Sequence, residues 1–447
     1  MIPSIRIVIC LLFILSIHET YAQKLDSLAT AVDSVVVDSL SISQFEIEAI
    51  VEDDDGSFPI EIDSIVSNAI RLEAFPGCVI YISQGDSTLL FKSYGYHTYD
   101  SLRRVAVNDI YDLASVTKVT GATLALMKLY EEGLINLDDP IGKYLDGLGR
   151  IRDATIRECL AHQAGLRPWI PYYQEVKKKN GRFRRNTVGP MSESYNYALT
   201  DSLFLHKDFY RKIKKMIGRT KISDEKVYRY SGLFFYLVPE LVEKLTGTTY
   251  DQYLRSTYYD SLGARTLTFN PLDTYTKSQI VPTENDTYFR MEQIHGTVHD
   301  EGAITMKGIS GNAGLFSNAE DLAKVWRMLL EEGKMDSMQF LRPETIQLFT
   351  TTQYPNNGNR RGLGFDKPLI DYDSVASSVA KDASYRSYGH SGYTGTLVWA
   401  DPENDLLFIF LSNRVYPTRE NRNLYKLNVR PSIHQLIYDQ IKKGPTK

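Results

Sequence analysis

Ser115 and Lys118 are the first residues whose types and spacing indicate chemistry. They lie three positions apart in "DLASVTKVTGATLALMKLYEEG", residues 112–133, a segment that is otherwise almost wholly apolar. Asp112 can cap a helix at its start and Gly133 can end it, so we predict a helix over 112–133. A helix that is apolar on all sides is a buried helix. Residues three apart share one face, so the hydroxyl and the amine should meet at the first turn.

Burial and the positive end of the helix dipole both disfavour the ammonium form of Lys118. We therefore hypothesise that Lys118 is neutral near pH 7 and accepts the proton of Ser115, which makes the serine a nucleophile. The alternative is a helix cap beside a lysine whose amine reaches solvent. A Ser-x-x-Lys match alone is weak evidence, because "SDEK" at 223–226 is a second match whose charged surroundings indicate solvated surface.

A serine nucleophile also needs a group that relays a proton to the leaving group, and donors for the oxyanion that forms. Two later segments offer candidates. Tyr230 comes just before an apolar stretch, predicted to be a helix, that ends at Gly247. The stretch "YGHSGYTGT", residues 388–396, leads into a predicted hairpin. There, Gly392 would let the backbone of a ligand approach an edge strand closely.

The N-terminal segment indicates export. Residues 1–22 contain one arginine, an apolar run and a small residue before Gln23, which is typical of a signal peptide cleaved after Ala22. Residues 23–57 are rich in acids and predict a flexible linker. Residues 58–447 are long enough for a large catalytic domain. Since no later stretch reaches membrane-spanning length, we expect a periplasmic or secreted protein with no stable membrane anchor.

Composition narrows the classes of partner. The formal net charge of -4 over 447 residues argues against a nucleic-acid binder. Only Cys78 and Cys159 remain after the signal peptide, each in an apolar stretch, so we expect two buried free thiols. Basic residues gather in 176–221, which we interpret as a solvated face. If this face lies over the site, it would favour a substrate with carboxylates. The sequence does not indicate the oligomeric state.

The two ends of the chain mirror each other. Apolar spacing predicts one helix from Ile62 and another near Ile433, and β-rich runs around turns predict hairpins near residues 78–95 and 395–413. We expect both ends to share one sheet, with a helical part inserted at about 113–290 and the site at the seam. Ser317 and Glu320 in "SNAE" match a capping box and predict the start of a further helix.

Three motifs in this order carry a family resemblance. Ser115-Val-Thr-Lys118, Tyr230-Ser-Gly232 and His390-Ser-Gly392 resemble those of the penicillin-recognising serine hydrolases, which include class C β-lactamases, D-alanyl-D-alanine carboxypeptidases and related esterases. "HGTVHDEGA" at 295–303 and "GHSGYTGT" look like a branch of this family. That branch includes a penicillin-binding carboxypeptidase and a muropeptide-salvaging N-acetylmuramoyl-L-alanine amidase. The resemblance covers about residues 58–440.

The resemblance implies an α/β (α+β) fold of the β-lactamase/DD-peptidase type, in which helices flank an antiparallel sheet and an all-helical subdomain is inserted. It implies that Ser115 is the acylated nucleophile, Lys118 its base and Tyr230 the proton relay. The backbone N–H groups of Ser115 and Tyr393 would form the oxyanion hole. It implies no cofactor and no metal. The substrate-binding residues that it implies are His390, Ser391, Gly392 and Tyr393.

Two positions depart from the family pattern. Gly232 stands where the family has an asparagine, which removes a hydrogen-bonding side chain near the substrate. His390 stands where the family has a lysine, so a fixed charge becomes one that titrates near pH 6.5. Both differences favour an amidase or an esterase over a β-lactamase or a strict carboxypeptidase.

We therefore expect an exported serine hydrolase that forms an acyl-enzyme and cleaves an amide in peptidoglycan-derived fragments, acting as an amidase or a D,D-carboxypeptidase. The alternatives are a carboxylesterase for small acyl esters and a binding module inactivated by Gly232. A metallohydrolase built on His295, His299 and neighbouring acids is disfavoured, because Gly296 and the branched residues after it disfavour the helix that would align the two histidines.

Overall fold

The computed structural model describes residues 57–443. The predicted signal peptide and the acidic linker up to residue 56 lie outside the described residues. None of the helices between residues 57 and 443 combines the length and the apolar character needed to cross a lipid bilayer.

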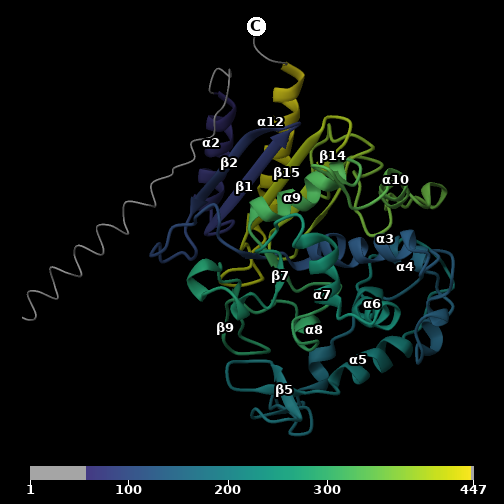
Figure 1. Ribbon diagram of the computed structural model, residues 1–447. Helices are drawn as coiled ribbons and strands as arrows, with labels where there is room; N and C mark the ends of the chain where they lie inside the picture. The colour runs from purple at the N-terminus through teal and green to yellow at the C-terminus, as the bar shows by residue number, and fades with distance from the viewer. Residues whose placement is uncertain (1–56, 444–447) are drawn as a thin grey trace, which may run out of the picture. The chain divides into compact units, whose positions relative to one another are not determined.

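A five-stranded antiparallel sheet joins the two ends of the chain (Figure 1). Its order is β13-β14-β15-β1-β2, so β15 from the C-terminal end pairs with β1 from the N-terminal end, with Ile80 opposite Phe410. Both predicted hairpins are present, as β1–β2 and β14–β15. The strands are β1 (Gly77–Gln84), β2 (Ser87–Gly95), β13 (Tyr388–Ser391), β14 (Leu397–Asp401) and β15 (Leu406–Ser412).

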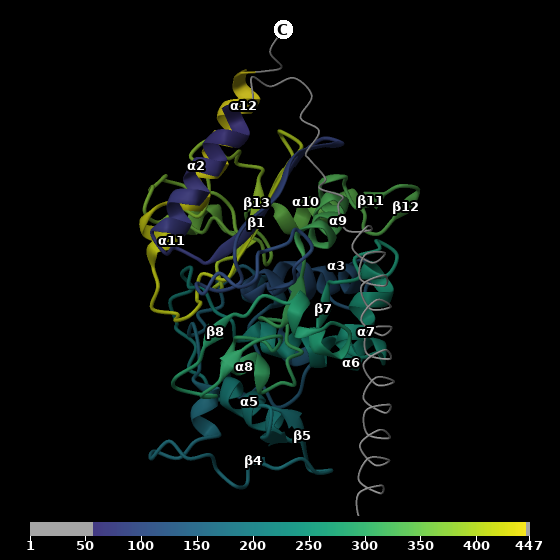
Figure 2. The ribbon, with the colours of Figure 1, turned by 90° about the vertical axis from the view of Figure 1, so that its left-hand side faces the viewer.

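Helices cover both faces of this sheet. In Figure 2, α2 (Ser57–Arg71) and α12 (Val429–Lys443) lie together on one side of the sheet and α9 (Ala319–Leu330) on the other. The alternation of side chains along a strand explains this arrangement. Ile80 packs into the cluster under α2 and α12, whereas Val79 belongs to the cluster that contains Trp326 of α9. The predicted fold class is therefore confirmed.

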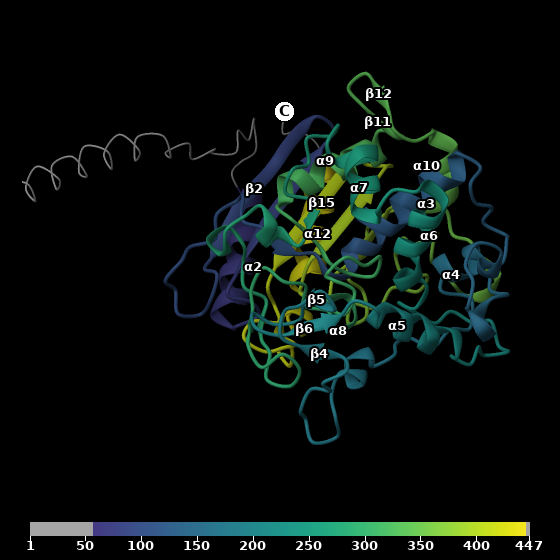
Figure 3. The same ribbon diagram turned by 60° about the horizontal axis from the view of Figure 1, so that its bottom comes forward.

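The segments between the two ends form a mainly helical part beside the sheet (Figure 3). Its helices are α3 (Thr123–Glu131), α4 (Ile156–Leu160), α5 (Phe209–Gly218), α6 (Val238–Thr246), α7 (Tyr250–Leu254) and α8 (Glu301–Ile304). Next to α3 lies α10 (Pro343–Thr350), whereas α11 (Asn423–Lys426) packs against α12. Its short strands are β3 (Tyr111–Asp112), β4 (Val188–Gly189), β5 (Tyr195–Ala198), β6 (Phe204–His206), β7 (Thr268–Phe269), β8 (Glu284–Asn285), β9 (Gln293–Ile294) and β10 (Leu315–Ser317), with a hairpin of β11 (Lys334–Met335) and β12 (Met338–Gln339) after α9.

Two further local predictions concern the cysteines and the N-terminal cap of α9. Cys78 and Cys159 are buried and free, as expected. The predicted cap of α9 is wrong by one residue. Asn318, not Ser317, has the extended backbone of a cap, and its side chain accepts the N–H of Asp321. Ser317 is the last residue of β10 and pairs there with Tyr111, so its backbone belongs to the strand and the helix cap falls on the next residue.

Phe410 tests the packing between sheet and helices. Its side chain is fully buried and meets the ring of Phe75 edge to face, with centroids 5.5 Å apart. We expect Phe410→Ala to lower the free energy of unfolding by about 3–5 kcal/mol, because the cavity it leaves cannot close fully. Chemical denaturation measures this loss. Leu102→Ala, at a side chain that is 87% exposed, is the control and should change stability by less than about 0.5 kcal/mol. Equal effects of the two substitutions would contradict this account of the core.

Candidate active site

Ser115 stands at the junction of a strand and a helix. Asp112 belongs to β3 and pairs with Phe316 of β10, so it does not cap a helix as predicted. A 3₁₀ turn, Ala114–Val116, follows, then a π turn, Lys118–Ala122, and only then α3. The predicted helix over 112–133 is thus a shorter α-helix preceded by two irregular turns. π turns inside helices occur frequently at functional sites.

A buried carboxyl group holds the turn that presents Ser115. Ala114 has a φ of +46°, a left-handed conformation that costs a non-glycine residue free energy. Its N–H donates to Oδ1 of Asp112 at 2.8 Å, and the N–H of His299 donates to Oδ2 at 2.7 Å. Burial raises the pKa of Asp112, and these two N–H groups act in the opposite direction. The strained turn is therefore fixed from a second segment of the chain.

The Lys118 amine lies against the Ser115 hydroxyl. Its side chain is buried, and Nζ donates to Ser115 Oγ at 3.0 Å and to the backbone oxygen of Asn312 at 2.8 Å. Both partners are uncharged. The amine also lies 5.5 Å from the ring centroid of Tyr230 and 5.6 Å from that of Phe235. The structure thus brings together the three residues proposed as nucleophile, base and proton relay.

Tyr230 lies in the loop before α6, and its half-buried ring lies beside two histidines. The ring centroid is 4.5 Å from that of His162 and 6.0 Å from that of His390. The next residue fixes this loop, because Ser231 donates its N–H to Nδ1 of His162 and its hydroxyl to the carbonyl of Arg167. His162 therefore supports the loop that carries Tyr230.

The motif 390–392 ends edge strand β13 beside the Ser115 turn. A Cβ atom at Gly392 would lie 2.6 Å from the carbonyl oxygen of Leu113, so only glycine allows this approach. Two threonine hydroxyls join the loop to the same stretch, since Thr396 donates to the carbonyl of Leu113 at 3.0 Å and Thr394 to that of Asp112 at 2.8 Å. These contacts place the expected substrate-binding residues next to the nucleophile.

The pKa of His390 differs from the value expected from the sequence. Burial, together with the positive charges of Arg361 and Lys118, lowers the pKa of His390 to about 3. The prediction that it titrates near pH 6.5 is therefore wrong, since that value assumed an exposed ring. Nδ1 lies 2.7 Å from the carbonyl oxygen of Ser391, which assigns the proton to Nδ1. Nε2 is then a buried acceptor with no partner among the described residues, and His390 offers no positive charge to a substrate.

Sequence reasoning missed two residues of the site. A Cβ at Gly232 would have only Tyr236 Cε2 nearby, at 3.9 Å, so the space of the missing asparagine is open. Asn312 instead supplies the carbonyl that Lys118 contacts, and its side-chain amide donates to the hydroxyl of Tyr236 at 3.1 Å. The sequence did contain a signal, because Gly311 and Gly314 flank this asparagine in "GNAG". The structure explains the first glycine, since a Cβ atom there would lie 2.4 Å from the backbone oxygen of Phe235.

Arg361 is the second residue that was missed. Its guanidinium is buried, with Cζ 5.3 Å from the centroid of the Tyr230 ring. Nε lies 3.2 Å from Asp366, whose carboxylate also pairs with Arg360. Nη1 has no hydrogen-bond partner within the described range. Two arginines against one carboxylate leave an excess positive charge behind Tyr230. Nothing in the spacing of "NRRGLGFD" distinguishes the buried arginine from its neighbour.

The histidines weighed as metal ligands have other partners. His295 Nε2 lies 2.7 Å from the carbonyl of Ile280, and His299 Nε2 lies 2.8 Å from Glu284. Arg419 pairs with Glu284 and Glu301 and so stands between the acids. Burial alone would raise the pKa of Glu284, but His299 and Arg419 lower it to about 2. Over residues 58–443, no three His, Cys, Asp or Glu side chains gather as a metal site would require.

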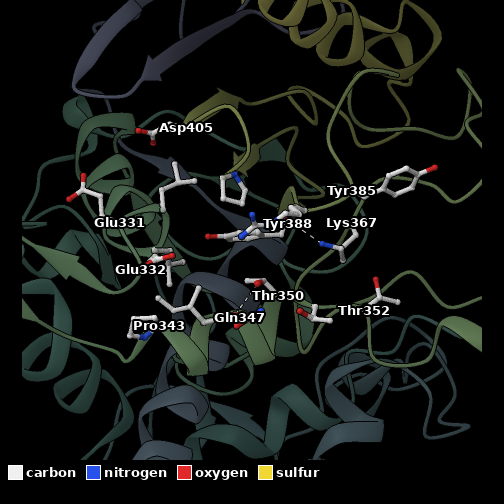
Figure 4. A pocket seen from close by; sticks show the side chains of 16 residues that line it. Glu331, Glu332, Pro343, Gln347, Thr350, Thr352, Lys367, Tyr385, Tyr388 and Asp405 are labelled. Carbon is white, nitrogen blue, oxygen red and sulfur yellow. Dashed lines mark hydrogen bonds between the residues drawn. The ribbon is translucent and has the colours of Figure 1, made fainter.

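A cavity of about 940 Å³ lies elsewhere, between α9, α10 and the back of β13. Its walls include none of the expected site residues. Figure 4 shows Glu331, Glu332 and Asp405 on one side of it and Lys367 and Tyr385 on the other. This cavity is therefore separate from the candidate active site.

Comparison with known proteins decides the family. The family model described as Beta-lactamase matches residues 62–429, which is most of the chain. The chain belongs to the beta-lactamase family. Members of this family are serine hydrolases, and the match spans Ser115, Tyr230 and His390 of the present chain.

Beta-lactamase-family relatives agree in sequence and in fold. The chain is 29% identical over 364 residues to a "Putative D-alanyl-D-alanine carboxypeptidase" of Escherichia coli (strain K12), covering 76% of this chain and 78% of the relative. The octameric penicillin-binding protein homologue of Pyrococcus abyssi has a similar fold, with a TM-score of 0.60 at 18% identity over 86% of this chain and 77% of that one. EstCE1, a hydrolase with promiscuous acyltransferase activity, gives 0.60 at 17% identity over 85% and 99%.

The buried state of His390 predicts how the protein responds to acid. In the folded protein the ring stays neutral down to about pH 3, whereas in the unfolded chain it takes up a proton below about pH 6.5. The unfolded state therefore binds more protons between these values, and His390 contributes to a loss of stability as the pH falls through this window. NMR of the His390 ring should show no titration between pH 8 and 5. A midpoint near 6.5 would contradict the environment described for His390.

Proposed function

We propose that the chain is an exported serine hydrolase that forms an acyl-enzyme at Ser115 and cleaves an amide bond in peptidoglycan-derived fragments. The contact that carries the proposal is the 3.0 Å hydrogen bond between Lys118 Nζ and Ser115 Oγ in a buried setting. The relatives named D-alanyl-D-alanine carboxypeptidases support an amide of this kind as substrate.

In the proposed reaction, Lys118 accepts the proton of Ser115 as Oγ attacks the carbonyl carbon of the amide. The oxygen that becomes negative lies between the N–H groups of Ser115 and Tyr393. Tyr230 passes a proton to the amide nitrogen, and the C–N bond breaks to release the amine. A water then attacks the carbonyl carbon of the Ser115 ester and gives one proton to Ser115 Oγ through Lys118, the bond between Oγ and the acyl carbon breaks, and the acid leaves. Lys118 Nζ and Arg361 Cζ lie 5.5 Å and 5.3 Å from the centroid of the Tyr230 ring, so the proton that Lys118 accepts can return to this phenol.

A carboxylesterase is the second candidate. The neutral His390 and the open space at Gly232 favour it, because neither provides a charge or an amide for the recognition of a substrate carboxylate. EstCE1, which has a similar fold, is described as a hydrolase with promiscuous acyltransferase activity. A non-catalytic binding module is the third possibility, since it would keep the fold and the site without turnover.

Mass spectrometry of products identifies the bond that is cut. Purified protein is incubated with enzymatically digested peptidoglycan, and we expect a separated glycan and peptide if the amide next to the sugar is cleaved, or a loss of D-alanine if the terminal one is. Ser115→Ala should form neither product, because the nucleophile is gone. Short-chain p-nitrophenyl esters form the comparison arm. Turnover of the esters but not of the peptidoglycan fragments would contradict the proposal and favour the carboxylesterase. Binding of muropeptides without turnover of either substrate would favour the non-catalytic binding module.

A further inference from the structure

Large aromatic side chains stand exposed beside the site. Trp169 is 48% exposed, Tyr288 40% and Tyr393 42%. Half-buried Tyr173 connects the first two, with ring centroids 6.2 Å from Trp169 and 5.6 Å from Tyr288. Exposed aromatic rings that gather in one place commonly mark a binding surface, because they supply much contact area. We call Trp169, Tyr173, Tyr288 and Tyr393 the aromatic arc.

Both ends of the arc meet the proposed catalytic motifs. At one end, the carbonyl of Pro168, next to Trp169, accepts the N–H of Gly232 at 3.2 Å. At the other end, Tyr393 directly follows Gly392, which packs against the turn that holds Ser115. The arc therefore runs from the motif of Tyr230 to that of His390. A substrate bonded to Ser115 would have the arc as its neighbour.

A charged network holds two rings of the arc, those of Tyr288 and Tyr393, in place. The guanidinium of Arg419 lies 4.5 Å from the centroid of the Tyr288 ring and donates to its hydroxyl at 2.7 Å. The ring of His299 stacks on that of Tyr393, with centroids 5.7 Å apart and planes 28° from parallel. Glu284 joins Arg419 to His299. Rings that are already fixed lose little conformational entropy when a ligand binds.

The chemistry of the arc fits a sugar ring. Each aromatic face is flat and apolar, which matches the C–H face of a pyranose. The acids nearby, Glu284 and Glu301, both pair with Arg419, so their oxygens are already engaged within the protein. A flat ligand with an apolar face and hydroxyl groups at its edge is the best match.

We propose that the aromatic arc binds the N-acetylated amino sugar of the substrate, beside the amide that Ser115 attacks. This inference rests on the proposed function for the identity of the peptide that follows the sugar. It adds a specificity: the sugar is recognised, and the same peptide without it binds weakly.

Binding to an inactive variant tests the arc directly. In the Ser115→Ala background, N-acetylmuramyl-L-alanyl-D-isoglutamine is compared with N-acetyl-L-alanyl-D-isoglutamine by calorimetry. We expect the sugar-bearing ligand to bind at least about tenfold more tightly. Trp169→Ala should remove most of this ratio and Trp169→Phe should retain it. Tyr288→Leu, which removes a second ring, should also reduce it.

Tyr385→Ala is the matched control. This tyrosine is 77% exposed and lines the cavity of Figure 4, away from the arc, so the ratio should not change. Equal affinity for the two ligands, or a ratio unaffected by both Trp169→Ala and Tyr288→Leu, would overturn the proposal. Because Ser115→Ala cannot turn over, the result is independent of hydrolysis. A sugar preference in a protein whose wild type cleaves neither amides nor esters would keep the arc and reject the proposed function.

Discussion

The buried amine of Lys118 is the group on which the rest of the site depends. It lies between a hydroxyl and a backbone carbonyl, at 3.0 Å from Ser115 and 2.8 Å from Asn312, and has no charged hydrogen-bond partner in the described range. Taking an amine out of water costs free energy, which hydrogen bonds and packing elsewhere in the fold must offset.

Segments from across the chain are needed to hold this arrangement. The Ser115 turn is strained at Ala114 and is fixed by the carboxyl of Asp112, while the loop after β13 is joined to the same turn by the hydroxyls of Thr394 and Thr396. The central sheet pairs the first and last parts of the chain, which places β13 at the edge next to the helical part. The site therefore exists only in the completed fold.

The features that the sequence predicted correctly are those that depend on residues close together in the chain. The two hairpins and the terminal helices follow from apolar spacing and turn residues, and Ser115, Lys118, Tyr230 and His390 were found as candidates because each lies in a recognisable stretch. Long-range contacts were not predictable. Asp112 and Ser317 were expected to cap helices, but both residues pair in strands instead. The place of Asn312 beside Lys118 and of Arg361 behind Tyr230 depends on residues far away in the sequence, as does the burial that lowers the pKa of His390.

The rate at which Ser115 is acylated in the absence of Lys118 tests the central claim most directly. A stopped-flow burst with an activated ester, and peptide mapping of the adduct, compare wild type with Lys118→Met. Lys128→Met is the control, because Lys128 is a partly buried lysine of the same helical segment whose amine bonds to the carbonyl of Phe340. We predict that Lys118→Met slows acylation of Ser115 by about 10²–10⁴-fold while Lys128→Met stays close to wild type. Unchanged acylation in Lys118→Met, or an adduct on another residue, would contradict the account.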